Sequence, residues 1–192
     1  MRNSVLCGFV LFISCALSGQ TTASVTVQPK NDLRSVLLGD WVGVLEYRDY
    51  SEPATSTKRV ALPTWLSITD AEPSKTLKWH YVYDDGPTKI VEETDIVTFD
   101  PASSSYAEAD NGKPAQIFKV AGYDTLRSGH GTLVLTGAGT ENDKPSETRV
   151  TMHIERNLIS FVEETRPTGT TDSFAFRHVY RFTRATAPQP GR

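Results

Sequence analysis

The chain has 192 residues, 38% hydrophobic and 22% charged, which is the composition of one ordinary globular domain. Its net charge of −3 is mildly acidic, and the sequence contains no run or stripe of Lys and Arg. Because nucleic acids and anionic membrane surfaces are bound mainly through clustered positive charge, neither is an expected partner.

Residues 1–23 have the layout of a secretory signal peptide. Arg2 gives a positive start, residues 5–17 are mostly apolar, and a polar stretch of small residues ends at Ala23. The apolar part is too short for a comfortable membrane span, so we expect cleavage after Ala23 and no spanning segment. The predicted location is periplasmic or extracellular, and the expected state is a monomer.

Both cysteines, Cys7 and Cys15, lie in this leader, so the exported chain would hold no disulfide. Residues 11–15, Leu-Phe-Ile-Ser-Cys, resemble a bacterial lipobox, in which the cysteine becomes a lipidated N-terminus. A lipid anchor at Cys15 is therefore the alternative to soluble export. Residues 24–34 are expected to form a flexible tether.

The pattern of apolar residues changes near Trp41. Residues 31–38 favour one or two helical turns, whereas the later apolar residues recur with period two rather than 3.6. Trp79, Tyr81 and Tyr83, for example, occupy every second position of one run. This alternation is typical of antiparallel strands with one buried face.

Turn signals rich in Gly, Pro, Asn and Asp separate the alternating runs at short intervals. They include residues 84–87, 110–114, 137–139 and 156–157. We therefore predict ten strands, near residues 41–48, 58–69, 76–84, 88–99, 103–109, 115–123, 131–137, 146–155, 158–165 and 173–184.

Strands joined mostly by hairpins, with no helical layer to cover a face, are expected to close on themselves because closure removes exposed edges. The predicted fold is all-β, a single antiparallel up-and-down β-barrel of about 8–10 strands. It would occupy residues 35–184, after a short helical turn, and a disordered tail would follow at residues 185–192. A β-sandwich is the alternative.

Two motifs at the ends of this pattern resemble the lipocalin-like (calycin) barrels. Gly39-Asp40-Trp41 matches a Gly-x-Trp entry to the first strand, and residues 177–182, Arg-His-Val-Tyr-Arg-Phe, form an arginine-rich closing strand. The resemblance implies that Trp41 plugs the closed end and that Arg177 or Arg181 packs across it, which would give a cation–π contact.

The chain also departs from the best-known calycins. It lacks the Thr-Asp-Tyr motif of lipocalins, and the gap between its first two strands is too short for the helical lid of fatty-acid-binding proteins. It is therefore most similar to lidless bacterial secreted barrels, such as the nitrobindin type.

The closing strand supplies the predicted ligand site. Strict alternation directs five side chains into the lumen, namely Phe174, Phe176, His178, Tyr180 and Phe182. Trp79 and Tyr81 would form a second aromatic wall. An apolar lumen with few polar groups suits a small lipophilic molecule.

His178 is the one histidine that the alternation places among aromatic side chains. A histidine in such a place can ligate haem iron, and the nitrobindin type resembles this arrangement. The competing interpretation is a core histidine hydrogen-bonded to a neighbour.

Other catalytic or metal-binding patterns are not found. No histidine pairs with a second metal ligand at the usual spacing, so no metal site is predicted. Glu93 and Asp95 share a strand face and could form an acid–base pair, but their polar flanks favour a solvated face. Glu163 and Glu164 form a second acidic pair. No serine-hydrolase or phosphate-binding motif appears, so no enzyme is predicted.

The sequence thus favours an exported barrel that binds a small, largely apolar ligand in its lumen. The alternative is a secreted protein–protein module such as a hydrolase inhibitor, since some small inhibitor barrels also begin with Gly-x-Trp. A barrel enzyme is the third interpretation.

Overall fold

The computed structural model describes residues 33–53, 56–72, 75–110 and 113–186. The predicted signal peptide, Cys15 and residues 24–32 of the predicted tether lie outside the described residues. The described chain contains a short helix, a 3₁₀ turn and ten strands: α1 (Leu33–Leu37), β1 (Gly39–Arg48), β2 (Arg59–Ala71), β3 (Thr76–Asp84), β4 (Ile90–Asp100), β5 (Ser105–Asp110), β6 (Gln116–Ala121), η1 (Tyr123–Thr125), β7 (Gly131–Glu141), β8 (Lys144–Ile154), β9 (Leu158–Pro167) and β10 (Ala175–Arg184).

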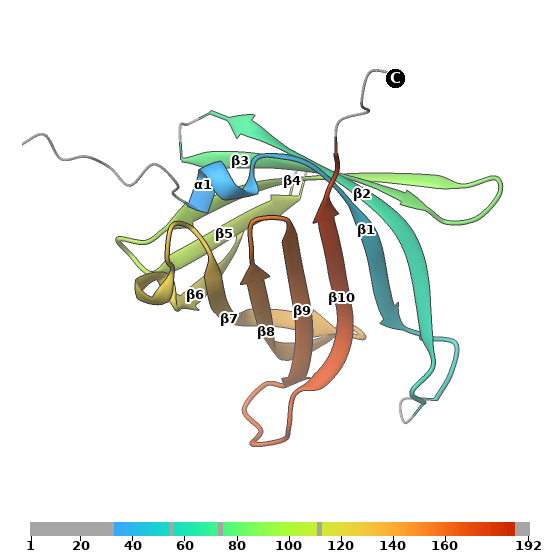
Figure 1. The fold of residues 1–192 in the computed structure, drawn as a ribbon. Helices are drawn as coiled ribbons and strands as arrows, with labels where there is room; N and C mark the ends of the chain where they lie inside the picture. Colours follow the sequence, from blue (N-terminus) through green and yellow to red (C-terminus); the bar gives the residue numbers. More distant parts are fainter. Residues whose placement is uncertain (1–32, 54–55, 73–74, 111–112, 187–192) are drawn as a thin grey trace, which may run out of the picture.

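The ten strands form one closed antiparallel barrel (Figure 1). Each strand pairs with its neighbours in the chain, and β1 pairs with β10 in a register that runs from Trp41–Arg184 to Tyr47–His178. The predicted up-and-down barrel is confirmed, and the sandwich alternative is wrong. Within the described residues, no helix is long and apolar enough to cross a membrane.

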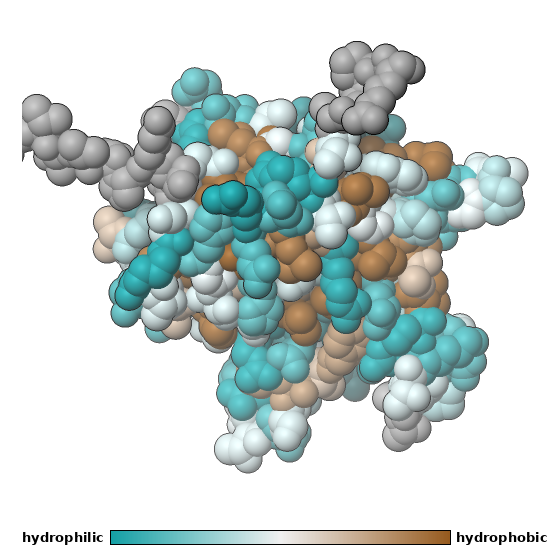
Figure 2. Space-filling model, viewed as in Figure 1, coloured by the Kyte–Doolittle hydropathy of each residue, from teal (hydrophilic) through white to brown (hydrophobic). Residues whose placement is uncertain are grey.

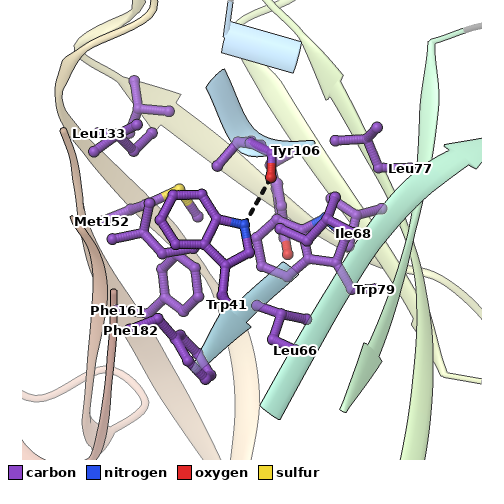
Figure 3. Packing of buried hydrophobic residues seen from close by; sticks show 14 of the residues in the cluster. Trp41, Leu66, Ile68, Leu77, Trp79, Tyr106, Leu133, Met152, Phe161 and Phe182 are labelled. Atoms are coloured by element: carbon purple, nitrogen blue, oxygen red, sulfur yellow. Dashed lines mark hydrogen bonds between the residues drawn. The ribbon is translucent and has the colours of Figure 1, made fainter. Parts of the chain in front are cut away.

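One end of the barrel is closed by α1 and Trp41. The Trp41 side chain is 1% exposed, and its Nε1–H donates to the carbonyl oxygen of Leu37 at 2.9 Å. Figure 3 shows this indole at the centre of the apolar cluster. Gly39, which joins α1 to Trp41, has a φ of +117°, a conformation that favours glycine.

Arg184, rather than Arg177 or Arg181, packs across Trp41. Its guanidinium carbon lies 4.1 Å from the centre of the indole ring. The same guanidinium donates to the backbone carbonyls of Leu38 at 2.8 Å and Val36 at 2.5 Å, carbonyls at the end of α1 that otherwise lack helical partners. Arg181 instead pairs with Glu46 on the outer face.

The apolar core surrounds Trp41 inside the barrel and contains side chains from most strands. Fully buried members include Leu66, Ile68, Leu77, Leu133, Met152, Ile154, Ile159 and Phe182. At about 25 cal/mol per Å² of apolar area removed from water, burial of this cluster is the main stabilising contribution to the fold.

The Gly-Ala-Gly run at residues 137–139 is not the turn that the sequence predicts, because β7 continues through it to Glu141. A Cβ atom on Gly139 would lie 2.3 Å from Oγ1 of Thr148, so the glycine allows β8 side chains to pack closely against β7. Asn142 and Asp143 make the hairpin turn instead, with φ angles of 51° and 60°.

The closing strand β10 contains a β-bulge at Arg177. His178 pairs with Glu163, whereas Phe176 pairs with Glu164, so Arg177 is an extra residue without a counterpart on β9. An inserted residue reverses the alternation of side chains along the strand. The predicted alternation is therefore wrong on the N-terminal side of His178.

The bulge places two predicted lumen residues outside the lumen. The Phe176 ring lies under the guanidinium of Arg59, with 4.4 Å between its centre and the guanidinium carbon. The Phe174 ring is stacked in the same way by Arg149 at 4.3 Å and Arg166 at 4.6 Å. These two phenylalanines stabilise the outer surface rather than line a ligand site.

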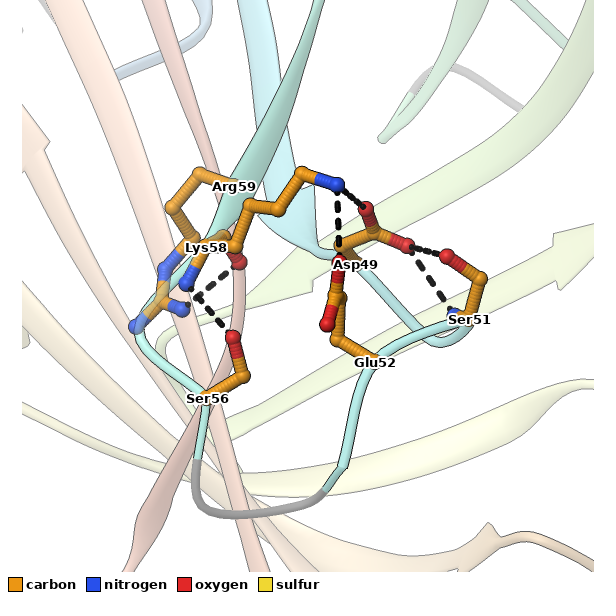
Figure 4. Close-up of polar contacts among 6 residues, drawn as sticks. All are labelled: Asp49, Ser51, Glu52, Ser56, Lys58 and Arg59. Carbon is orange, nitrogen blue, oxygen red and sulfur yellow. Dashed lines mark hydrogen bonds and ion pairs between the residues drawn. The ribbon is translucent and has the colours of Figure 1, made fainter.

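The β1–β2 connection is held by a polar cluster (Figure 4). Nζ of Lys58 lies 3.1 Å from Oδ2 of Asp49 and 2.9 Å from Oε1 of Glu52. Asp49 also accepts hydrogen bonds from the backbone and hydroxyl of Ser51. Hydrogen bonds from Ser51 and Lys58 hold the pKa of Asp49 below its usual range.

Candidate ligand-binding site

A cavity of about 420 Å³ lies in the barrel lumen. It is lined by residues from strands β3 to β10, and its lining includes His178, which pairs with Tyr47 at the end of β1 opposite Trp41. This volume falls within the range of small-molecule sites. The barrel therefore has a packed end around Trp41 and a hollow end around His178.

Aromatic rings form the inner wall of the cavity. Trp79 stacks on Phe161 with 5.3 Å between ring centres, and Tyr81 lies 5.5 Å from Tyr180. Period-two alternation on β3, β9 and β10 directs these rings inward. Such rings give a ligand a large apolar surface with little freedom to rearrange.

The structure brings some of the predicted ligand residues together in the lumen. Trp79, Tyr81, His178 and Tyr180 line the cavity. Phe174 and Phe176 do not, and Arg177, expected at the closed end, lines the cavity instead because of the bulge.

Tyrosine hydroxyls donate to carboxylates at the cavity wall. The Tyr83 hydroxyl donates to Oε2 of Glu93 at 3.0 Å, so its oxygen accepts the proton of the Tyr180 hydroxyl 2.9 Å away. The Tyr106 hydroxyl donates to Oε2 of Glu108 at 2.7 Å. Burial raises the pKa of Tyr106 well above its usual range, so this hydroxyl keeps its proton.

Acidic side chains from β4 and β5 gather beside the aromatic wall. Asp95 is 6% exposed, so the predicted solvated face is wrong for this residue. Burial, followed by the charges of Glu108, Glu93 and Asp110, raises the pKa of Asp95 to about 7. Burial likewise raises the pKa of Glu108. Carboxyls this close cannot all ionise freely.

Carboxylate oxygens of Glu93, Asp95 and Asp110 lie within 4.8 Å of one another. Calcium in proteins takes about six to eight oxygen ligands, and magnesium demands near-ideal octahedral geometry. The three side chains alone do not meet either requirement, and Lys113 forms an ion pair with Asp110. We assign no metal to this cluster.

A second group of charges comes from β9 and β10. Nη1 of Arg177 lies 3.4 Å from Glu163 and 3.4 Å from Glu141, and it donates to the Thr140 carbonyl at 3.1 Å. Burial raises the pKa of Glu163 to about 7, against the opposing effect of Arg177. Burial and the Arg177 charge lower the pKa of His178 to about 4, so this histidine is neutral at neutral pH.

His178 does not fit the haem arrangement that the sequence suggested. Its Nε2 lies 3.4 Å from Oε2 of Glu163, so the nitrogen that would ligate iron faces a carboxyl group. Its ring meets the Tyr180 ring edge-on at 5.4 Å. The surroundings of His178 instead suit a partly buried, neutral side chain in a polar network.

The sequence did not predict several residues of the site. Glu108 and Glu163 belong to the cavity wall, as do Tyr106 and Met152. The alternation Tyr106–Glu108 on one strand was the available signal, because an inward tyrosine places the glutamate two residues later on the same face.

No protein-family model matches the chain, and no curated protein matches it in sequence. The closed ten-stranded barrel is compatible with a lipocalin-like fold, and membership of the calycin superfamily stays a prediction.

Proposed function

We propose that this protein is an exported binding module that holds a small amphipathic ligand in the barrel lumen. The observation that carries the proposal is the cavity of about 420 Å³ walled by aromatic side chains on one side and by ionisable groups on the other. Concave sites with an apolar wall and a few convergent polar groups are typical of small-molecule binding.

The wall composition refines the ligand expected from the sequence. Trp79, Tyr81 and Phe161 offer a surface for an apolar body, as a lipophilic ligand requires. Glu93 and Glu108, however, add charge that a purely apolar molecule would bury without compensation. A ligand with an apolar body and a polar group therefore matches the cavity better.

Titration with the neutral dye Nile red tests binding in the lumen. We expect the dye fluorescence to rise on binding to the wild type and the binding to be lost in Val150→Phe, which adds a ring to the cavity lining. Val42→Phe is the matched control, because Val42 lies on β1 and is 40% exposed on the outer face. Thermal unfolding of both variants establishes that they are folded.

Equal dye binding by the wild type and Val150→Phe would place the dye outside the lumen and overturn the proposal. Absence of binding to the wild type, by the dye and by the amphipathic probes described below alike, would do the same.

Export is supported by the leader pattern of residues 1–23. The intact mass of the protein purified from its source tests this part. We expect a chain beginning at Ser24 or at a lipidated Cys15, and a soluble intracellular chain that retains Met1 would contradict export.

A protein–protein module is the second candidate, because the outer face carries an apolar pair. Val42 and Trp65 are cross-strand partners on β1 and β2, and they are 40% and 45% exposed. Figure 2 shows that apolar residues on the viewed face are interspersed with hydrophilic ones. Failure of dye binding together with capture of a secreted hydrolase, abolished by Trp65→Ala, would favour this function.

A further inference from the structure

We propose that the lumen takes a small organic cation, an amine or quaternary ammonium group carried on an apolar body, and that the positive group lies between the β4–β5 carboxyls and the aromatic wall. This inference rests on the proposed function and names the ligand class for that site. It follows from three features of the cavity.

The first feature is an imbalance of charge. The arginine and the lysine that line the cavity already have acidic partners: Arg177 reaches Glu163 and Glu141, and Lys113 pairs with Asp110. On the facing wall, Glu93 and Glu108 line the cavity, and the buried Asp95 lies next to Glu108. None of the three forms an ion pair with a basic residue that the structure describes, although the charge of Lys113 also acts on Glu93 and Asp95. Tyr83 and Tyr106 supply neutral hydrogen bonds to two of them.

Carboxyl groups without a counter-charge are costly to bury, and they keep their protons instead of ionising. The raised pKa of Asp95, about 7, is the expected result for this wall. A ligand cation would supply the missing positive charge and allow these carboxyls to ionise. The acidic wall therefore gives the cavity an electrostatic preference for a cation.

The second feature is the aromatic surface beside these carboxyls. Trp79 and Asp95 are cross-strand partners on β3 and β4, as are Tyr81 and Glu93. Tyr106 lies on β5, two residues before Glu108. A cation held by the carboxyls would thus lie near the faces of electron-rich rings, which attract positive charge.

The third feature is an unsatisfied donor. Trp79 is 2% exposed and lines the cavity, yet its Nε1–H has no hydrogen-bond partner among the described residues. A buried indole N–H normally finds an acceptor. This donor is independent of the acidic cluster, and it marks Trp79, whose ring lines the cavity, as an incompletely satisfied part of the wall.

The test compares two probes of nearly the same shape, the cationic amine tryptamine and the neutral alcohol tryptophol. Both are titrated calorimetrically into the full exported chain at neutral pH. We expect tryptamine to bind about tenfold more tightly or better, as one cation–π contact plus a partly buried ion pair would give. High salt should weaken tryptamine more than tryptophol.

Variants locate the cation. Glu108→Gln and Asp95→Asn should each reduce the preference for tryptamine while leaving tryptophol binding unchanged. Glu92→Gln is the matched control, since Glu92 lies on the same strand as Asp95 with an exposed side chain that faces His80. It should change neither affinity.

Each result decides the inference. Equal affinities for the two probes, or a preference for tryptamine that survives both Glu108→Gln and Asp95→Asn, would overturn the cation assignment. If Nile red binds in the lumen and tryptamine does not, the proposed binding function stands and the cation class is wrong. If none of the three probes binds, the proposed function itself is wrong.

Discussion

The two ends of this barrel use the same strands for opposite purposes. Around Trp41 the interior is packed, and the polar atoms at the closed end are bonded: the Trp41 indole N–H donates to the Leu37 carbonyl, and Arg184 donates to the carbonyls of Val36 and Leu38. Around His178 the interior is hollow and contains carboxyl groups with raised pKa values. Trp79 belongs to both regions, because it packs in the apolar cluster and lines the cavity, and its Nε1–H lacks a partner among the described residues.

This contrast separates stability from function within one fold. Complete packing and satisfied polar groups lower the free energy of the folded chain, whereas a cavity and poorly compensated charges raise it. Under the proposed function, a bound ligand would offset this cost. The comparison yields four predictions, given from the largest expected effect to the smallest.

Loss of the Trp41 side chain should have the largest effect on stability. Trp41→Ala removes a fully buried indole, and we expect the free energy of unfolding to fall by about 3–5 kcal/mol. Urea denaturation measures this change. Trp65→Ala is the control: Trp65 is 45% exposed on the outer face, so the same substitution should cost far less. Similar losses for both tryptophans would contradict the distinction between the packed end and the surface.

The contact of Arg184 with Trp41 should contribute less to the free energy of unfolding. Arg184→Met keeps much of the aliphatic stem but removes the ring contact and the bonds to the α1 carbonyls, which we expect to cost about 1–3 kcal/mol. Arg181→Met removes an exposed pair with Glu46 and should cost less than about 1 kcal/mol. If urea denaturation showed the larger loss of stability for Arg181→Met, the assignment of Arg184 as the residue that holds Trp41 would be wrong.

The acidic side chains at the hollow end should lower the stability of the protein as the pH rises. Most acidic residues in folded proteins have the opposite effect. Because the folded-state pKa of Asp95 is raised to about 7, its contribution to stability is full below the unfolded pKa near 3.8 and is lost as the pH rises through 7. Glu163, raised to about 7, acts in the same sense. We expect the wild type to be less stable above pH 7 than in mild acid.

The variant Asp95→Asn tests this contribution, since an amide does not ionise. Relative to the wild type it should gain about 1–2 kcal/mol above neutral pH and little in mild acid. Urea denaturation across that pH window measures the difference, with Glu92→Gln as the exposed control on the same strand. Groups close to Asp95 that titrate or carry charge are Glu93, Glu108, Asp110, Lys113, Tyr106 and Tyr180. A pH profile of Asp95→Asn identical to that of the wild type would show that Asp95 does not carry the effect.

The sequence could predict the packed end better than the hollow end for physical reasons. Period-two alternation and turn residues fix the strands locally, and Gly39-Asp40-Trp41 marks the entry of β1. The arginine on Trp41 could not be chosen from the strand alone, because Arg177, Arg181 and Arg184 all lie on β10 and only the register of the barrel seam decides between them.

The cavity depends on features that are not local. The bulge at Arg177 leaves no clear signature in the residues around it, yet it reverses the orientation of the earlier side chains on β10. The acidic wall likewise arises because Asp95 and Glu108 meet across β4 and β5, and residue spacing within either strand does not reveal that contact.

The smallest expected effect tests the bulge itself. Phe174 contacts the guanidinium groups of Arg149 and Arg166 on the outer face, so Phe174→Ala should remove two cation–π contacts and lower the free energy of unfolding by about 1 kcal/mol. It should leave Nile red binding unchanged, because the ring does not line the cavity. Tyr180→Ala, on the C-terminal side of the bulge, should weaken the dye, since Tyr180 lines the cavity and stacks on Phe182. An uninterrupted alternation along β10 would make both substitutions weaken the dye. Loss of dye affinity in Phe174→Ala would therefore contradict the bulge and place Phe174 in the lumen.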